Sequence, residues 1–163
     1  MAKKAYIGID PGASGALCLL IPETKEIEFC STKDPAEIYE WLVSIKKEYH
    51  AVIILLEDVH SIHGTSAKSN FNFGRNLGRV ETLAEVSEIG FDRILPKAWQ
   101  SKCNIKVPQG ITGPARKKLL KKNTAQKCKE LYPQAAIYGP KGGLLDGKSD
   151  SLMIAHAAYL IYN

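Results

Sequence analysis

The sequence predicts an α/β fold: a mixed five-stranded sheet with helices on both faces. Three observations carry this prediction. Three short apolar segments joined by tight connections stand near the N-terminus, β-rich and helix-patterned segments then alternate, and the chain ends in two helices. A length of 163 residues, with 45% hydrophobic and 24% charged residues, is typical of one globular domain, here 1–163.

The first three strands are predicted at 5–9, 16–21 and 26–30. The turn sequence PGASG (11–15) separates the first two, and a break at 22–25 separates the second from the third. Strands joined by such tight connections pair in an antiparallel meander.

A helix is predicted next, with Asp34 as its N-cap, Pro35 at its first position and Glu37 completing a capping box. Its buried face is defined by apolar residues that recur every three or four positions: Ile38, Trp41, Leu42, Ile45 and Tyr49. The run AVIILLE (51–57) is apolar on both faces, which predicts a central strand of a covered sheet.

A polar loop is predicted at 58–70, followed by a helix from about Phe71 to Ile89 that ends at Gly90 as its C-terminal cap. Gly74 and Gly78 lie one turn apart on this helix and would permit close approach of a neighbour. A fifth strand is predicted at 91–95.

The segment 96–113 contains two prolines and two glycines and is predicted to be irregular. Pro114 then opens a basic helix that ends before Pro133. The final helix is predicted from about Ser149 to Tyr162, with Asp150 in its first turn.

Charge is distributed unevenly along the chain. The net charge is +5, and ten basic residues with no acidic residue fall between Lys97 and Lys129. This asymmetry is typical of a protein that binds a phosphate backbone. The alternative interpretation is a solvated, lysine-rich helix face.

The four cysteines are widely spaced, without a C-x-x-C pair, which argues against a zinc site and favours buried thiols. The apolar runs are too short to cross a bilayer, and the N-terminus lacks the long apolar region of a signal peptide. We therefore expect a cytoplasmic protein without a membrane partner, and no motif indicates an organic cofactor.

Four acidic residues end strands or begin a helix. Asp10 ends the first strand and Glu57 the central one. If these strands are adjacent and parallel, they lie about 4.8 Å apart and their two carboxylates come within reach of one cation. Asp146 and Asp150 frame the start of the last helix. Carboxylate oxygens suit Mg²⁺ or Mn²⁺, and two such ions can hydrolyse a phosphodiester. As alternatives, these acids could form a turn, a strand end and a helix start.

Three runs resemble, in order, the motifs of RuvC-type Holliday junction resolvases: IGIDPGASGAL (7–17), IILLEDVHS (53–61) and LDGKSDSLMIAHAAYL (145–160). The segment PKAWQSK (96–102) and the lysine-rich helix are similar to the phage and bacterial branch, and departures from the bacterial pattern favour a phage origin. The resemblance implies a ribonuclease H-like fold, a homodimer, and paired nicks in branched DNA. It also implies two Mg²⁺ ions in each active site, with Mn²⁺ as a substitute.

The resemblance further implies that Asp10, Glu57 and Asp150 bind metal. In the bacterial enzymes the last two acids are three residues apart, but here that position is Gly147. Asp146, four residues before Asp150, is therefore the candidate for the fourth ligand. His60 stands near the place of the family's stacking aromatic residue, and the alternative is a simple loop histidine.

DNA phosphate contacts are expected from basic side chains of the third quarter of the chain: Lys102, Lys117, Lys118, Lys121 and Lys122. On a helix Lys117 and Lys121 share one face, and Lys118 and Lys122 share the next. Trp99 is expected to be a packing residue. His156 is expected to be a helix histidine, with a water-positioning base as the alternative.

By analogy with the family, the helix with Gly74 and Gly78 is the candidate dimer interface, and Phe71 and Phe73 are expected in the core or at that interface. Rival functions are a flap, three-way-junction or RNA–DNA hybrid nuclease of the same fold, or a non-catalytic junction-binding module. The segment GIDPGASG (8–15) also resembles the phosphate loop of sugar kinases and actin-like ATPases, but those need two such domains.

Overall fold

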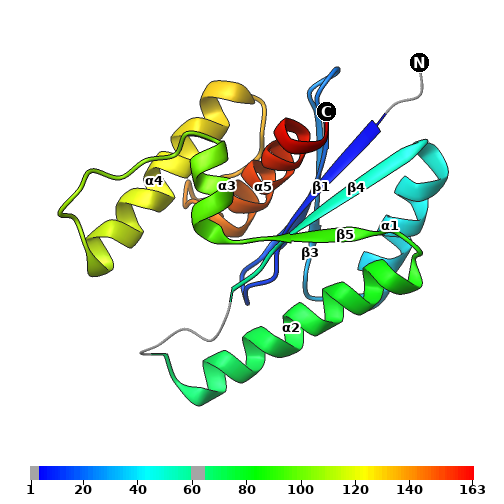
Figure 1. Ribbon diagram of the computed structural model, residues 1–163, viewed down its shortest axis with the longest axis horizontal. Coiled ribbons are helices and arrows are strands. Elements are labelled where there is room, and N and C mark those ends of the chain that lie inside the picture. The colour runs from blue at the N-terminus through cyan, green and yellow to red at the C-terminus, as the bar shows by residue number, and fades with distance from the viewer. Residues whose placement is uncertain (1–3, 60–64) are drawn as a thin grey trace.

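A five-stranded mixed sheet forms the centre of the computed structural model, which describes residues 4–59 and 65–163. The strand order is β3-β2-β1-β4-β5 (Figure 1), with bounds β1 (Lys4–Asp10), β2 (Ala16–Ile21), β3 (Glu26–Ser31), β4 (Ala51–Glu57) and β5 (Phe91–Ile94). The first three strands pair antiparallel, and β4 and β5 run parallel to β1. The predicted mixed sheet is confirmed.

Helices cover both faces of the sheet. On one face α1 (Pro35–Glu48) and α2 (Ala67–Val86) enclose a core with Ile7 and Ile9 of β1. On the other face, α3 (Pro96–Lys102), α4 (Gly113–Leu131) and α5 (Asp146–Tyr162) enclose a core with Tyr6 and Leu55. Successive residues of β1 and β4 alternate between these cores, as the strand period requires.

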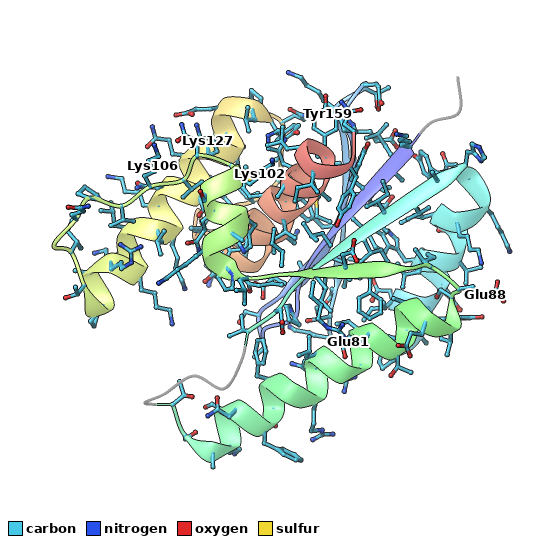
Figure 2. The ribbon with its side chains drawn as sticks, viewed as in Figure 1. Glu81, Glu88, Lys102, Lys106, Lys127 and Tyr159 are labelled. Carbon is cyan, nitrogen blue, oxygen red and sulfur yellow. The ribbon has the colours of Figure 1, made fainter. Side chains whose placement is uncertain are left out.

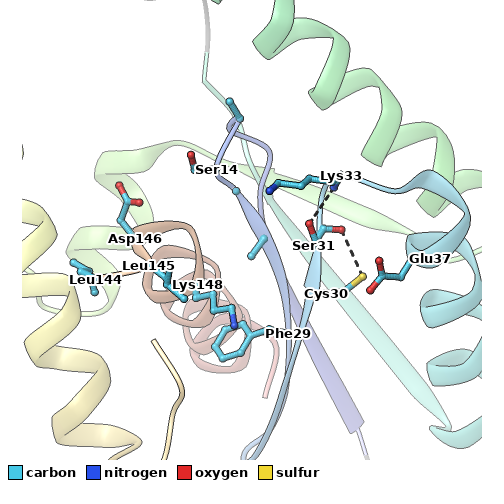
Figure 3. A pocket seen from close by; sticks show the side chains of 13 residues that line it. Ser14, Phe29, Cys30, Ser31, Lys33, Glu37, Leu144, Leu145, Asp146 and Lys148 are labelled. Atoms are coloured by element: carbon cyan, nitrogen blue, oxygen red, sulfur yellow. Dashed lines mark hydrogen bonds between the residues drawn. The ribbon is translucent and has the colours of Figure 1, made fainter. Parts of the chain in front are cut away.

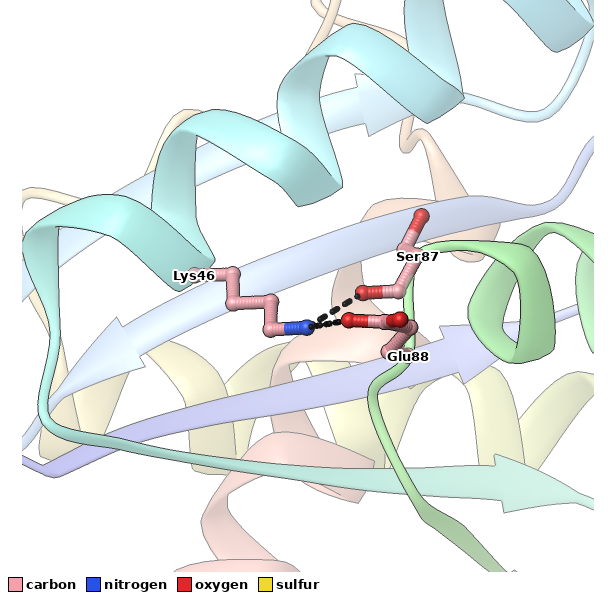
Figure 4. A network of polar contacts seen from close by, with 3 residues as sticks. All are labelled: Lys46, Ser87 and Glu88. Carbon is pink, nitrogen blue, oxygen red and sulfur yellow. Dashed lines mark hydrogen bonds and ion pairs between the residues drawn. The ribbon is translucent and has the colours of Figure 1, made fainter.

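Local capping fixes the start of α1, as the sequence predicts. The Asp34 carboxylate accepts a hydrogen bond from the Ala36 amide at 2.9 Å. At the other end of the helix, the Lys46 ammonium donates to the Ser87 carbonyl at 3.1 Å and to the Glu88 carboxylate at 2.8 Å (Figure 4). These two bonds join the end of α1 to the end of α2.

The predicted bounds of α2 are wrong at both ends. The helix begins four residues before Phe71, because the Ser66 hydroxyl caps it by accepting a hydrogen bond from the Ser69 amide. It ends before Gly90, because Glu88 adopts a left-handed conformation with φ of 55°. The Ile89 amide then donates to the Ala84 carbonyl at 3.1 Å, which closes the helix end.

Two further predictions are wrong. The segment 96–113 is not irregular throughout, because its first seven residues form α3 with Pro96 in the first turn. The last helix begins at Asp146 and not near Ser149. Asp150 therefore lies in the second turn of α5, one turn further from the helix start than expected.

The backbone of α5 lies directly on β1 at Gly8. A Cβ atom at Gly8 would stand 2.1 Å from the Ser151 carbonyl oxygen and 2.3 Å from the Ala155 amide nitrogen. Only glycine permits this approach. The contact holds the helix that carries Asp146 and Asp150 against the strand that ends in Asp10.

The four cysteines are buried free thiols, as predicted: Cys18, Cys30, Cys103 and Cys128. Burial raises the pKa of the Cys103 thiol to about 12, so this group is uncharged at neutral pH. Within residues 4–59 and 65–163, no helix is both long and apolar enough to span a membrane.

Candidate active site

The ends of two neighbouring strands bring Asp10 and Glu57 to the same edge of the sheet. Ile9 of β1 lies opposite Leu56 of β4, and the two strands are parallel. The residues that follow, Asp10 and Glu57, therefore project from adjacent strand ends. Burial is the main cause that raises the pKa of Glu57, and the nearby charge of Asp10 raises it further, as expected for neighbouring carboxylates.

The first turn of α5 is fixed against the turn between β1 and β2. A Cβ atom at Gly147 would stand 2.0 Å from the Ser14 carbonyl oxygen and 2.9 Å from the Gly15 Cα. No side chain fits at position 147, three residues before Asp150, where the family resemblance would place an acid. Asp146, one residue earlier, presents the carboxylate instead.

Asp10 is held by its own turn. Its carboxylate accepts a hydrogen bond from the Gly12 amide at 2.9 Å. Burial raises the pKa of Asp10, and the charge of Asp146 raises it further, while the Gly12 hydrogen bond and the charge of Lys121 lower it. The Asp10 side chain therefore has a fixed orientation and a destabilised charge.

Glu57 accepts a hydrogen bond from the indole nitrogen of Trp99 at 2.8 Å. Burial, followed by the charge of Asp10, raises the pKa of Glu57 to about 7, and the Trp99 bond opposes this rise. Trp99 lies on α3 and is only 1% exposed.

Trp99 packs in the core as the sequence predicts, but it also orients a candidate ligand, which sequence reasoning missed. A buried tryptophan needs an acceptor for its N–H group. That requirement was the available signal. Trp99 follows β5, the strand that pairs with β4, and Ile94 of β5 lies opposite Glu57, so Glu57 is a nearby acceptor.

Asp150 interacts with the other three acids. Burial raises its pKa to about 8, with further increases from the charges of Asp10, Glu57 and Asp146, while Lys121 lowers it. The four carboxylates therefore form one electrostatically coupled group, which we call the acidic cluster: Asp10, Glu57, Asp146 and Asp150.

Lys121 reaches from α4 into the acidic cluster. Its ammonium forms an ion pair with the Asp146 carboxylate, and this hydrogen bond raises the pKa of Lys121. Three other expected phosphate contacts on α4 are exposed: Lys117, Lys118 and Lys122. Lys102, also exposed, ends α3, and Figure 2 shows it on the same side of the molecule as Lys106 and Lys127.

The donor set of the acidic cluster suits a hard cation, although its carboxylates stand further apart than the ligands of one bound ion. Among the residues that the structure describes, no three acidic, histidine or cysteine side chains are grouped closely enough to hold one metal ion. A divalent cation would relieve the repulsion that raises the pKa of Glu57 and Asp150. Carboxylate oxygens are also the ligands that Mg²⁺ and Mn²⁺ take.

No protein-family model and no curated protein sequence matches the chain. Solved structures do match it, among them two of RuvC from Thermus thermophilus. Thermus thermophilus RuvC in complex with a Holliday junction substrate aligns with a TM-score of 0.62 and 15% identity, over 96% of this chain and 93% of that one. A second Thermus thermophilus RuvC structure aligns with a TM-score of 0.57 and 16% identity, over 95% of this chain and 94% of that one.

The chain has the RuvC-type fold. The predicted ribonuclease H-like arrangement is thereby confirmed: three antiparallel strands, then alternating helices and strands, with helices on both faces.

A hollow of 630 Å³ adjoins Asp146 in this RuvC-type fold (Figure 3). The turn between β1 and β2, the end of β3 and the start of α5 line it. The Lys148 ammonium lies 5.1 Å from the centre of the Phe29 ring on one wall.

The structure describes one of the two histidines to which the sequence gives a candidate role. His60 falls outside the described residues. The Tyr132 hydroxyl and His156 Nδ1 are hydrogen-bonded at 2.7 Å, joining the end of α4 to α5. Burial, with a smaller contribution from Lys127, lowers the pKa of His156. The hydrogen bond to Tyr132 indicates the structural role for this histidine.

Three of the four α2 residues expected at a dimer interface are open to solvent. Phe71 is 66% exposed, so it does not belong to the core. Phe73 is half-buried, and added Cβ atoms at Gly74 and Gly78 would meet nothing within 4 Å. This face of α2 is therefore free to approach another molecule.

Proposed function

We propose that the chain is a metal-dependent endonuclease that resolves four-way DNA junctions by hydrolysing phosphodiester bonds. The observation that carries the proposal is the acidic cluster, in which Asp150 responds to the charges of Asp10, Glu57 and Asp146. Its support is the fold, which is shared with a RuvC protein whose structure contains a Holliday junction substrate.

The acidic cluster would hold two Mg²⁺ ions, for which Mn²⁺ can substitute. When bound, such a pair makes a water molecule nucleophilic and stabilises the leaving 3′ oxygen. The four carboxylates come from two strand ends and the first two turns of α5. Each therefore projects from a rigid element, which favours a fixed geometry around the reacting phosphate.

Residues around the cluster keep these carboxylates in place. The Gly12 amide orients Asp10, and the Trp99 indole orients Glu57. Groups that hydrogen-bond to metal ligands fix ligand orientation and contribute to metal affinity. Lys121 neutralises Asp146 in the metal-free protein, and displacement by a cation would release its ammonium to a substrate phosphate.

Substrate binding depends on cations that flank the cluster. The exposed Lys102, Lys117, Lys118 and Lys122 of α3 and α4 would contact backbone phosphates. Such contacts position the duplex without reading its sequence.

Paired nicks require two active sites. We therefore propose a homodimer formed through the open face of α2 that contains Gly74 and Gly78. A twofold axis through this face would give the two acidic clusters equivalent positions on the two strands of a junction. The enzyme would act in the cytoplasm, which is the host cytoplasm if a phage encodes it.

Cleavage of a labelled four-way junction tests the proposal, with linear duplex, flapped DNA and an RNA–DNA hybrid as controls. Wild type and Asp10→Asn are assayed with Mg²⁺, Mn²⁺ and chelator. Symmetric, metal-dependent nicks on the junction, absent from Asp10→Asn, are expected. Equal cutting of flaps or hybrids would refute the junction preference. Tight junction binding without cutting under any metal would leave a non-catalytic binding module.

A further inference from the structure

One face of α2 carries polar residues at helical spacing. Asn72, Arg75, Asn76 and Arg79 are separated by three, one and three positions, so they share one side of the helix. They face the turn between β1 and β2 and the connection between β3 and α1. Together these segments enclose a hollow of 350 Å³, which we call the α2 hollow, lined by Ala13, Thr32, Lys33, Asn72, Arg75, Asn76 and Arg79.

Among the described residues, the lining of the α2 hollow carries three positive charges and no negative one. Lys33, Arg75 and Arg79 line it together with uncharged residues only. In the described part of the chain, no ion pair neutralises any of the three cations. The Arg75 guanidinium lies 5.8 Å from the centre of the Phe71 ring, which leaves its N–H groups available. Three cations around one hollow repel each other, and a bound anion relieves that repulsion.

The α2 hollow continues the hollow beside Asp146. The two share Ala13 and Lys33 as lining residues. The Thr32 hydroxyl donates to the Gly15 carbonyl at 3.3 Å, which ties the connection between β3 and α1 to the turn that follows Asp10. Figure 3 shows Lys33 extending toward this turn. One turn thus forms a wall of the α2 hollow and positions a residue of the acidic cluster.

We propose that the α2 hollow binds the phosphodiester backbone of a DNA strand beside the acidic cluster. Guanidinium, ammonium and amide groups are donors that bind phosphate oxygens, and the hollow presents all three kinds. The lysines of α4 would hold the substrate on one side of the cluster and the α2 hollow on the other. In naming DNA as the ligand, this inference rests on the proposed function.

The test measures metal-free binding of a labelled four-way junction as salt rises from about 50 to about 200 mM. The variant Arg75→Gln/Arg79→Gln removes two charges from the α2 hollow. The control Lys4→Gln/Lys47→Gln removes two exposed charges near the opposite end of the sheet. Each lost phosphate contact lowers the slope of log affinity against log salt by about 0.9.

The salt slope of the α2 variant is expected to be lower than that of wild type by about 1.8, and the slope of the control by less than about 0.5. Arg75→Gln alone, at an exposed position, should lose about 0.9 and keeps the test informative if the double variant does not fold. Equal slopes for the α2 variant and the control would overturn the proposal, as would a wild type that does not bind the junction. If inorganic phosphate weakens junction binding but the salt slopes of the α2 variant and wild type are equal, the hollow is a site for a free anion. This result would also overturn the proposal.

Cleavage by the same proteins separates this proposal from the proposed function. If wild type cuts the junction and the α2 variant binds it with an unchanged salt slope, the nuclease function is supported and phosphate binding in the α2 hollow is refuted. If wild type never cuts the junction but the α2 variant has a lower slope, phosphate binding in the α2 hollow is supported and the nuclease function is refuted.

Discussion

Replacing Glu57 by glutamine removes a charge that the metal-free fold disfavours. Burial and the neighbouring Asp10 raise the pKa of Glu57 from 4.5 to about 7. Because a pKa shift of one unit corresponds to about 1.36 kcal/mol, ionisation of Glu57 destabilises the folded protein by about 3 kcal/mol. Below pH 4.5 the group is protonated in both states, so the cost is absent. It grows as the pH rises to about 7 and is fully present above that value.

Urea denaturation in the presence of chelator measures this contribution at about pH 5 and about pH 9. Glu57→Gln keeps a carbonyl oxygen that can accept the Trp99 hydrogen bond, so only the charge changes. The variant should exceed wild type in free energy of unfolding by up to about 3 kcal/mol at the higher pH, and by much less at the lower pH. Glu40→Gln, on the exposed side of α1, should stay within about 0.5 kcal/mol of wild type at both.

Adding Mn²⁺ at the higher pH should make wild type more stable than Glu57→Gln. On the proposed metal site, the ion would bind folded wild type through Glu57 and stabilise it by mass action, whereas the glutamine variant would lack this charged ligand. A stability difference that is independent of pH, or a glutamine variant less stable at the higher pH in chelator, would refute the reasoning.

Three further predictions follow from contacts of the acidic cluster. Trp99→Phe keeps an aromatic ring but removes the hydrogen bond to Glu57, and should weaken Mn²⁺ binding about tenfold in calorimetry; unchanged affinity would mean that Trp99 only packs. Lys121→Gln removes the cation that competes for Asp146 and should tighten Mn²⁺ binding about fivefold by the same measurement, whereas weaker binding would contradict that competition. Gly147→Ala forces a Cβ onto the Ser14 carbonyl and should lower the free energy of unfolding by about 2 kcal/mol or more in urea, a loss that an unaltered midpoint would contradict.

The strand ends of the site could be predicted from sequence because they depend on local patterns. The apolar run before Glu57 and the turn after Asp10 give strand type, length and end directly. The parallel pairing of β1 and β4, with Ile9 opposite Leu56, then follows from the topology of a covered sheet.

What the sequence did not reveal depends on contacts between distant segments. The Schellman end of α2 uses Glu88 in a left-handed conformation, where a glycine would be expected. The bond from Trp99 to Glu57 spans 42 positions, and the ion pair of Lys121 with Asp146 links α4 to α5. Periodicity along one segment carries no information about such partners.

The tight backbone packing around Gly147 shows the same limit for the proposed metal ligands. The spacing of the last two acids departs from the bacterial pattern, and the sequence alone leaves Asp146 as a candidate only. The structure supplies a physical reason, because the β1–β2 turn occupies the space of a side chain at position 147. A backbone contact across the fold thus decides which position can present the acid.

The most direct test of the central claim is to locate Mn²⁺ by anomalous diffraction in crystals grown near pH 8, where Glu57 is ionised. We predict anomalous density between Asp10 and Glu57, with Asp146 or Asp150 completing the coordination and the Lys121 ammonium displaced from Asp146. Mn²⁺ bound elsewhere, or an acidic cluster that stays empty while Lys121 keeps its ion pair, would contradict the proposed metal site.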